Sequence, residues 1–214
     1  MAVVIEREGK TVSEATINAC EELGVPRTEI EVEILNEGSS GVLGIGGKNA
    51  RVKISLKNSN FSIKGLRAKK ALGDLLNYLA DSHSVNIKET HDKIKLDVTM
   101  SDDRGLIIGK RGEMIKAMEY IVGKIASRSC DDGREKRVSI DVDGYKKRRE
   151  DTISRLVRET INKVKETGQS VTLDRLSASE RRLVYIKLKR ERGIQFETKL
   201  GQNDFKSIKI RKSG

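Results

Sequence analysis

The sequence predicts an α+β protein made of three small domains. Charged residues make up 35% of the 214-residue chain, above the ~25% usual for globular proteins. A large surface relative to volume explains that share and favours several small cores over one large core. Net charge is also uneven: residues 1–60 carry −2, residues 61–143 carry +2 and residues 144–214 carry +11. We therefore place the domains at residues 1–58, 62–143 and 144–214.

The first domain is predicted to have the order β-α-β-β. Thr11 with Glu14 three residues later is a capping-box signal for the start of a helix, and Gly24 with Pro26 ends it. The glycine-rich residues 37–47 lack a following Lys-Ser/Thr and precede a strand, so we interpret them as a turn rather than a phosphate loop. Apolar alternation predicts strands at residues 2–6, 30–34 and 52–56, and a polar linker follows at 57–60.

The second domain is predicted to have the order α-β-β-α-α-β. Its first helix extends over residues 63–82, with four leucines on one stripe. Apolar residues at helical spacing predict a core-facing helix after Gly112, and they are Met114, Ile115, Met118, Ile121, Val122 and Ile125. Alternation predicts strands at residues 85–89, 94–98 and 138–142.

The third domain is predicted to be a small α/β module that opens with a long basic helix over residues 146–166. The apolar residues expected to face its core are Ile153, Leu156, Val157, Ile161 and Val164. Leu173 lies in a short extended piece, and Ser177 with Glu180 is a second capping box, which opens a helix ending near Arg192. Two strands, at residues 195–199 and 206–211, close the domain.

Composition argues against catalysis and for a polyanionic partner. The only histidines are His83 and His91, the only cysteines are Cys20 and Cys130, and no hydrolase, metalloprotease or P-loop motif occurs. We therefore predict no enzyme activity, no cofactor and no metal site. The net +11 of the last third indicates nucleic acid or an anionic membrane surface. No membrane span or signal pattern occurs, and a reducing cytoplasm is the expected compartment.

The most specific motif is a Gly-x-x-Gly loop with a basic pair inside it. Its residues are Ile107, Ile108, Gly109, Lys110, Arg111 and Gly112, with Ile115 three residues further on. Glycines allow a nucleic-acid backbone to approach closely, the basic pair meets phosphates, and the apolar residues form a groove for bases. Together with the α-β-β-α-α-β frame, this motif resembles a type II K-homology (KH) domain. The scarcity of aromatic residues fits a KH groove better than a stacking platform.

The third domain resembles an R-3-H domain, which binds single-stranded nucleic acid. The resemblance rests on Arg181 and Tyr185, four residues apart at the start of the capped helix. Tyr185 stands where that family has histidine; it keeps a ring and a hydrogen-bond donor but cannot become cationic. We expect the two side chains to form one nucleic-acid-facing patch beside the helix N-terminus, with Leu183, Ile186 and Leu188 turned to the core. A half-buried packing role for Tyr185 is the alternative.

KH followed by R-3-H resembles the Jag family (SpoIIIJ-associated proteins, also called KhpB or EloR). The resemblance covers essentially the whole chain, because residues 41–44 (Gly-Val-Leu-Gly) are similar to a stretch typical of the Jag N-terminal domain. It implies a bacterial, cytoplasmic regulator that binds single-stranded RNA, with single-stranded DNA as the alternative ligand. It also implies links to cell elongation, division or sporulation, and a small stand-alone KH protein as partner.

A second function follows from the same resemblance. Some family members associate with a membrane-protein insertase, so the chain could instead serve as a membrane-associated interaction adaptor for the insertase or the cell-wall machinery. In that hypothesis the acidic first domain contacts proteins and the basic last third touches anionic lipid. The basic helices have aliphatic, core-sized apolar stripes without tryptophan, which is not typical of membrane-binding helices.

Overall fold

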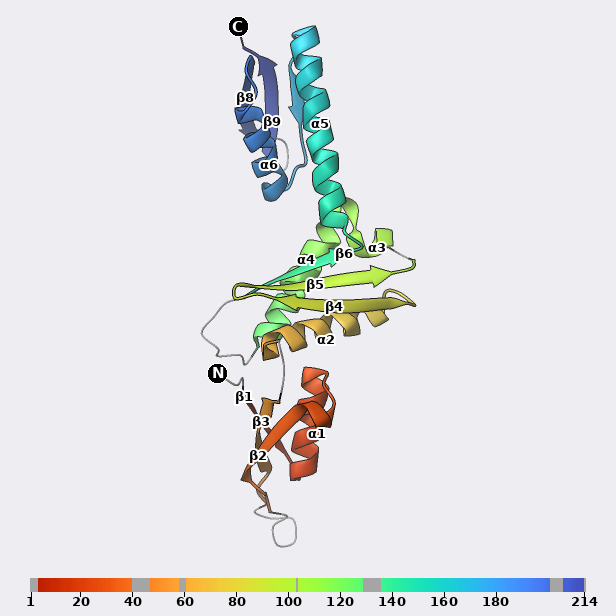
Figure 1. Cartoon of the computed structure of the whole chain (residues 1–214), viewed down its shortest axis with the longest axis vertical. Helices are drawn as coiled ribbons and strands as arrows, with labels where there is room; N and C mark the ends of the chain where they lie inside the picture. The colour runs from red at the N-terminus through yellow and green to blue at the C-terminus, as the bar shows by residue number, and fades with distance from the viewer. Residues whose placement is uncertain are drawn as a thin grey trace. The chain divides into compact units, whose positions relative to one another are not determined.

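The chain forms two compact units, residues 1–143 and residues 144–214. The computed structural model describes residues 4–39, 47–57, 61–102, 104–128, 136–200 and 206–213. Within them lie three separate three-stranded sheets, two in the first unit and one in the second (Figure 1). This architecture confirms the predicted α+β class with several small domains.

The first sheet has the predicted β-α-β-β connectivity and the strand order β1-β3-β2, with both pairs antiparallel. Thr11 caps α1 by accepting the Glu14 N–H, and Gly24 ends the helix in the left-handed region, as the sequence indicated. Helix α1 packs on one face of the sheet (Figure 1). The elements are β1 (Val4–Gly9), α1 (Val12–Leu23), a 3-10 turn (Arg27–Glu29), β2 (Ile30–Asn36) and β3 (Ala50–Leu56).

Strand β1 extends further than expected, to Gly9 rather than to residue 6. Gly9 pairs with Ala50, and a Cβ atom on Gly9 would lie 2.5 Å from the Ala15 backbone nitrogen, so the glycine lets α1 pack directly on the strand end. The expected turn at residues 37–47 and linker at 57–60 fall mostly outside the described residues.

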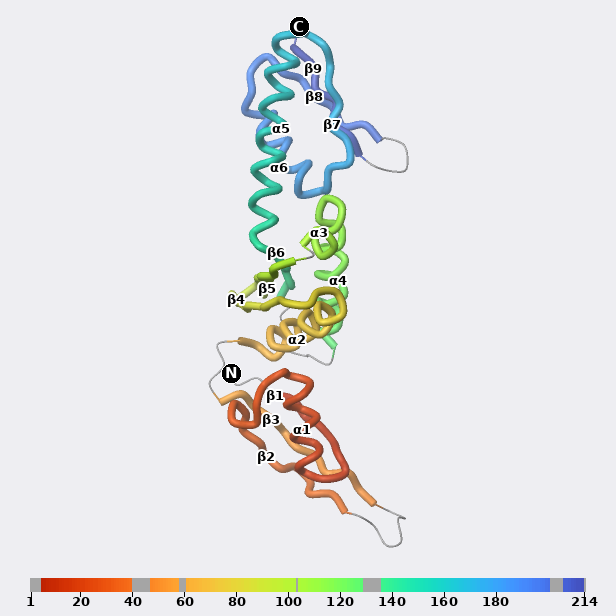
Figure 2. Tube along the Cα trace, turned by 90° about the vertical axis from the view of Figure 1, so that its right-hand side faces the viewer, coloured from red at the N-terminus to blue at the C-terminus, as the bar shows by residue number. Residues whose placement is uncertain are grey.

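The second sheet has the order β4-β5-β6, with β4 antiparallel and β6 parallel to the central β5. Figure 2 shows α3 and α4 to one side of these strands. The α-β-β-α-α-β order therefore stands as predicted. The elements are α2 (Ile63–Asn77), β4 (His83–Glu89), β5 (Lys93–Met100), α3 (Arg104–Ile108), a 3-10 turn (Lys110–Gly112), α4 (Glu113–Ser127) and β6 (Arg137–Val142).

Two details of this domain differ from the expectation. Helix α2 ends at Asn77 rather than residue 82, because β4 already begins at His83. On α4, Ile115, Met118 and Val122 are buried as expected, but Ile121 and Ile125 are exposed. The predicted apolar stripe of α4 is wider than the face that the sheet and α2 cover.

The third sheet has the order β7-β9-β8, and α5 and α6 supply the helical part of its core. Ile153, Val157, Ile161 and Val164 are buried on α5 as predicted, whereas Leu156 is exposed. Helix α6 ends at Lys189, three residues before the expected Arg192. The elements are α5 (Tyr145–Thr167), β7 (Val171–Leu173), α6 (Ala178–Lys189), β8 (Ile194–Leu200) and β9 (Lys206–Lys212).

Candidate nucleic-acid interface

The Gly-x-x-Gly loop forms a tight corner between α3 and α4. Three of its four residues have positive φ: Gly109 at 69°, Arg111 at 58° and Gly112 at 80°. A Cβ on Gly109 would lie 2.6 Å from Cβ of Met114, so only glycine fits at this point. The loop is therefore a fixed backbone shape with no side chain at its two glycine positions, as a closely approaching phosphate chain requires.

The side chains of this loop divide into exposed and buried groups. Lys110 is exposed, and Ile108 and Arg111 are half-buried. We expected Ile107 and Ile115 to line a groove for bases, but they are only 0% and 2% exposed. Both side chains fill the core beneath the corner, because α3 and α4 pack there, so their contact with bases stays a prediction.

Sequence reasoning missed one apolar side chain beside the loop. Leu106 on α3 is 57% exposed, although it precedes the buried Ile107 directly. In a helix of five residues, neighbours point in different directions, so one isoleucine enters the core while Leu106 faces solvent. Leu106 and Ile108 are the apolar groups of this segment that a base could contact.

The N-terminus of α4 is open to an anion. Its cap residue is Gly112, which supplies no side-chain hydrogen bond to the first backbone N–H groups. Unsatisfied N–H groups and the helix dipole favour negative charge at such a terminus. Lys110 lies in the turn directly before it, so one phosphate could meet both the side chain and the helix end.

Arg181 and Tyr185 lie on α6 as predicted, but each is bound to the fold of the third domain. The Nη1 of Arg181 donates to the Leu176 carbonyl at 2.7 Å. The hydroxyls of Tyr185 and Thr198 are 2.6 Å apart, and the Tyr185 ring stacks on Phe196 with centroids 5.8 Å apart. Both side chains are half-buried, so they connect the 174–177 segment, α6 and β8.

Both helices carry an acidic residue in the first turn, Glu113 on α4 and Glu180 on α6, but only Glu180 caps its helix. Ser177 and Glu180 form the predicted capping box, and the Glu180 carboxylate also pairs with Arg149 at 2.7 Å. Burial alone would raise the pKa of Glu180, but hydrogen bonds from the Ser177 N–H and from Arg149 outweigh it and hold the pKa below its usual value. A phosphate at this helix end would have to compete with Glu180.

The solvent-facing side of α6 carries residues that sequence reasoning passed over. Arg182, Lys189 and Arg190 are exposed, with Ile186 between them. Leu188 is buried in the core as expected and Leu183 packs against it, but Ile186 is exposed and Val184 is the second buried residue of the helix. The spacing of Arg182, Ile186, Lys189 and Arg190 places them on one side of the helix. That spacing is the sequence signal that could have identified this basic stripe.

Comparison with known proteins identifies the family. Residues 7–56 match the family described as "Jag N-terminus", and residues 69–142 match "KhpA/KhpB, KH domain". The chain is 31% identical over 201 residues to "RNA-binding protein KhpB" of Clostridium symbiosum, covering 94% of this chain and 88% of that protein. The chain belongs to the Jag/KhpB family.

Further members of the Jag/KhpB family extend the comparison. Identity to the Bacillus subtilis (strain 168) protein of the same name is 29% over 178 residues, covering 83% of this chain and 82% of that protein. The KH match of this Jag/KhpB chain includes the whole α3–loop–α4 corner and the strands β4, β5 and β6.

Neither a metal cluster nor a membrane-spanning helix occurs among the described residues of this Jag/KhpB chain. Where the structure describes the chain, no group of three or more His, Cys, Asp or Glu side chains could hold a metal ion. None of the described helices is long and apolar enough to cross a membrane.

Proposed function

We propose that this protein is a regulatory RNA-binding protein whose main contact is the Gly109–Gly112 loop, with single-stranded RNA as ligand. One observation carries the proposal. The loop combines positive-φ glycines, an exposed Lys110 and the uncapped N-terminus of α4 within a single corner. Single-stranded nucleic acid offers a flexible phosphate chain and accessible base edges, which suit that corner better than a duplex does. Relatives named as RNA-binding proteins support the same ligand.

A second, weaker contact in the third domain completes the proposal. Residues 144–214 carry net +11, and their exposed cations include the α6 stripe of Arg182, Lys189 and Arg190. Two modest sites on one strand gain affinity because the second binding event is intramolecular. We infer that Arg181 and Tyr185 act mainly by holding α6 in place, and that the exposed stripe meets the phosphates.

The cellular role is proposed by family membership. We propose a cytoplasmic regulator with links to cell elongation, division or sporulation, peripheral association with a membrane insertase, and pairing with a stand-alone KH protein. Tyr120, Ile121 and Ile125 support this pairing, because they form an exposed apolar strip on α4. Burial of such a strip against a partner would be favourable at about 25 cal/mol per Å².

The decisive experiment reverses the charge of the loop. We expect Lys110→Asp with Arg111→Asp to weaken binding of a labelled single-stranded RNA pool by about tenfold or more at low salt, measured by fluorescence anisotropy. Lys10→Asp with Lys93→Asp is the matched control, because both lysines are exposed and lie outside the corner.

Unchanged affinity in the folded loop variant contradicts the proposal. A single-stranded DNA pool measured in parallel tests the alternative ligand. Co-sedimentation with anionic vesicles in place of RNA binding would favour the membrane-adaptor hypothesis.

A further inference from the structure

A groove of about 780 Å³ runs along β4 and α2 in the first unit, far in sequence from the Gly109–Gly112 loop. Strand β4 is an outer strand of its sheet, and within the described residues it pairs with β5 alone. Its side chains His83, Val85 and Ile87 line the groove and are only half-buried. An outer strand of seven residues with partly open apolar side chains is a template for a further strand.

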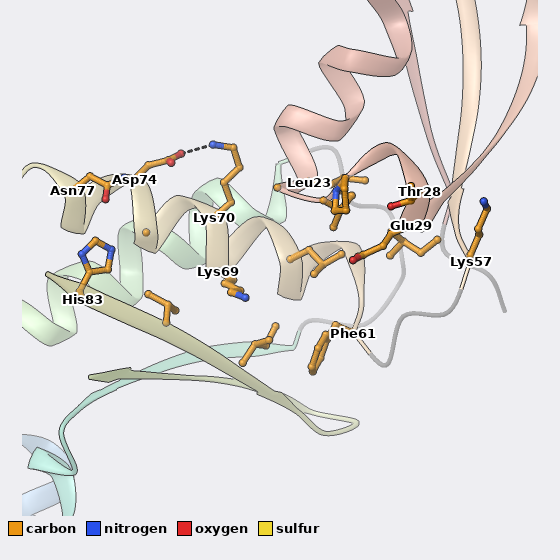
Figure 3. Close-up of a pocket in the computed structure, with 18 residues that line it drawn as sticks. Leu23, Thr28, Glu29, Lys57, Phe61, Lys69, Lys70, Asp74, Asn77 and His83 are labelled. Carbon is orange, nitrogen blue, oxygen red and sulfur yellow. Dashed lines mark hydrogen bonds and ion pairs between the residues drawn. The ribbon is translucent and has the colours of Figure 1, made fainter. Parts of the chain in front are cut away.

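Apolar residues from other elements continue the lining at one end of the groove. Figure 3 shows Phe61 below α2, and Leu23 on the side of the first domain. The remaining apolar lining residues are Val25, Pro26, Leu56 and Leu66. The groove therefore has an apolar strip beside β4 and α2, and polar side chains such as Asn77 and Asp74 complete its lining.

Gly73 on α2 lines this groove. A glycine inside a helix is unfavourable relative to alanine, and it is normally retained where a side chain would clash. Gly65 on the same helix meets that condition, since a Cβ there would lie 2.5 Å from Oε2 of Glu89. A Cβ on Gly73 would meet nothing within 4 Å, yet Gly73 lines the groove. The space beside it is open, so a large side chain at position 73 would fill the groove whereas a methyl group would not.

Lys69 places an exposed positive charge beside the apolar strip of this groove. Figure 3 shows its side chain between α2 and β4, one helical turn from Gly73. Lys70, beside it, pairs with Asp74 at 2.8 Å, whereas Lys69 has no ion-pair partner among the described residues. An occupant that carries a carboxylate at this position would complement the lysine.

We propose that the β4–α2 groove binds an extended peptide segment of a partner protein. The segment pairs with the outer edge of β4, its alternate apolar side chains contact Val85, Ile87 and Phe61, and an acidic side chain meets Lys69. Addition of a strand at a sheet edge beside a helix is an established mode of peptide recognition. The open edge of β4 and the apolar side chains beside it favour a peptide strand, and RNA binding at the groove is an outcome that the test distinguishes. The inference is independent of the RNA site, because no residue of the loop lines the groove.

The test uses the full-length protein and a phage-displayed random decapeptide library. Selection with counter-selection against Gly73→Arg should yield peptides with alternating β-branched or aromatic residues and a central Asp or Glu. Labelled copies of the selected peptides should bind Gly73→Arg and Lys69→Glu at least tenfold more weakly than the unchanged protein. A peptide with Lys in place of its acidic residue should recover affinity for Lys69→Glu.

Two controls separate a blocked groove from a damaged fold. Gly73→Ala removes a helix-weakening residue without filling the groove, so its melting temperature should rise while peptide affinity changes less than threefold. Lys93→Glu makes the same charge change on β5, outside the groove, and should leave peptide affinity unchanged.

Three results would overturn the proposal. One is a library that yields no groove-dependent peptide, and another is selected peptides that bind Gly73→Arg as well as the unchanged protein. The third is weaker binding of a labelled single-stranded RNA pool to Gly73→Arg than to the unchanged protein. That result would make the groove part of the RNA-binding surface. The Lys110 and Arg111 variant should keep full peptide binding, so failure of this inference and failure of the RNA proposal are distinguishable.

Discussion

The hydroxyl of Tyr185 lies 2.6 Å from the hydroxyl of Thr198 and so connects the middle of α6 to β8. The ring also stacks on Phe196 in the same strand. Tyr185 thus packs at the edge of the core of residues 144–214. Substitutions at this site should therefore affect stability before they affect RNA binding.

Tyr185 variants should separate the ring from the hydroxyl. Tyr185→Phe should cost about 0.5–1 kcal/mol, the lower part of the range for a lost hydrogen bond, because the site is only half-buried. Tyr185→Ala should cost roughly 2–3 kcal/mol, below the value for a fully buried aromatic. Denaturant melts of these variants and of Thr198→Val, combined in a double-mutant cycle, measure the coupling. If folded Tyr185→Phe lost RNA affinity with unchanged stability, the packing role would be refuted.

Gly109→Ala should disrupt the loop corner. The residue has φ of 69°, and the new Cβ would lie 2.6 Å from Cβ of Met114, so we expect a loss of about 1–3 kcal/mol together with weaker RNA binding. Gly105→Ala is the matched control, since a Cβ there meets nothing within 4 Å on the adjacent helix α3. Thermal melts and anisotropy report both quantities, and equal behaviour of the two variants would contradict the assigned backbone role.

RNA binding should weaken steeply with salt, because contacts from Lys and Arg to phosphate release counterions. For single strands the slope of log K against log salt changes by about 0.7 per contact. Removal of residues 144–214, which hold the net +11, should reduce the slope more than removal of residues 1–60, which hold −2. Arg182→Ala with Lys189→Ala tests the α6 stripe within the full chain. If removal of residues 1–60 reduced the salt slope more than removal of residues 144–214, the basic last third would serve solubility rather than RNA binding.

Glu180 should make the third domain sensitive to acid. Its pKa is below the usual 4.5 in the folded protein, so ionised Glu180 stabilises the fold fully above about pH 4.5, and this contribution is lost as pH falls through the lowered folded-state value. Glu180→Gln should therefore be less stable than the unchanged chain at pH 7, by on the order of 1 kcal/mol. In urea melts, the difference in unfolding free energy between the two proteins should become smaller as the pH falls from 5 to about 3. If the difference in unfolding free energy did not change with pH, the charge of the Glu180 carboxylate would not contribute to stability.

The local signals of the sequence were sufficient for most elements and for the loop. Both capping signals mark helix starts that the structure confirms, because a cap depends only on residues three positions apart. Ser177 and Glu180 form the full reciprocal box, whereas at Thr11 only the hydroxyl bond to the Glu14 N–H is present. The Gly109–Gly112 motif likewise predicts its own backbone shape, since positive φ is a property of the glycines.

Tertiary structure alone decided which side chains are available to a ligand. Helical spacing placed Ile121, Ile125 and Ile186 on apolar stripes, but the neighbouring elements cover only part of each stripe and leave these residues exposed. The same limit applies to Ile107, which is buried in the core, and to Tyr185 on helix α6, whose partner Thr198 lies 13 residues away on strand β8. Periodicity along one helix states which residues share a face, whereas burial depends on what packs against that face, and the packing partners come from distant parts of the chain.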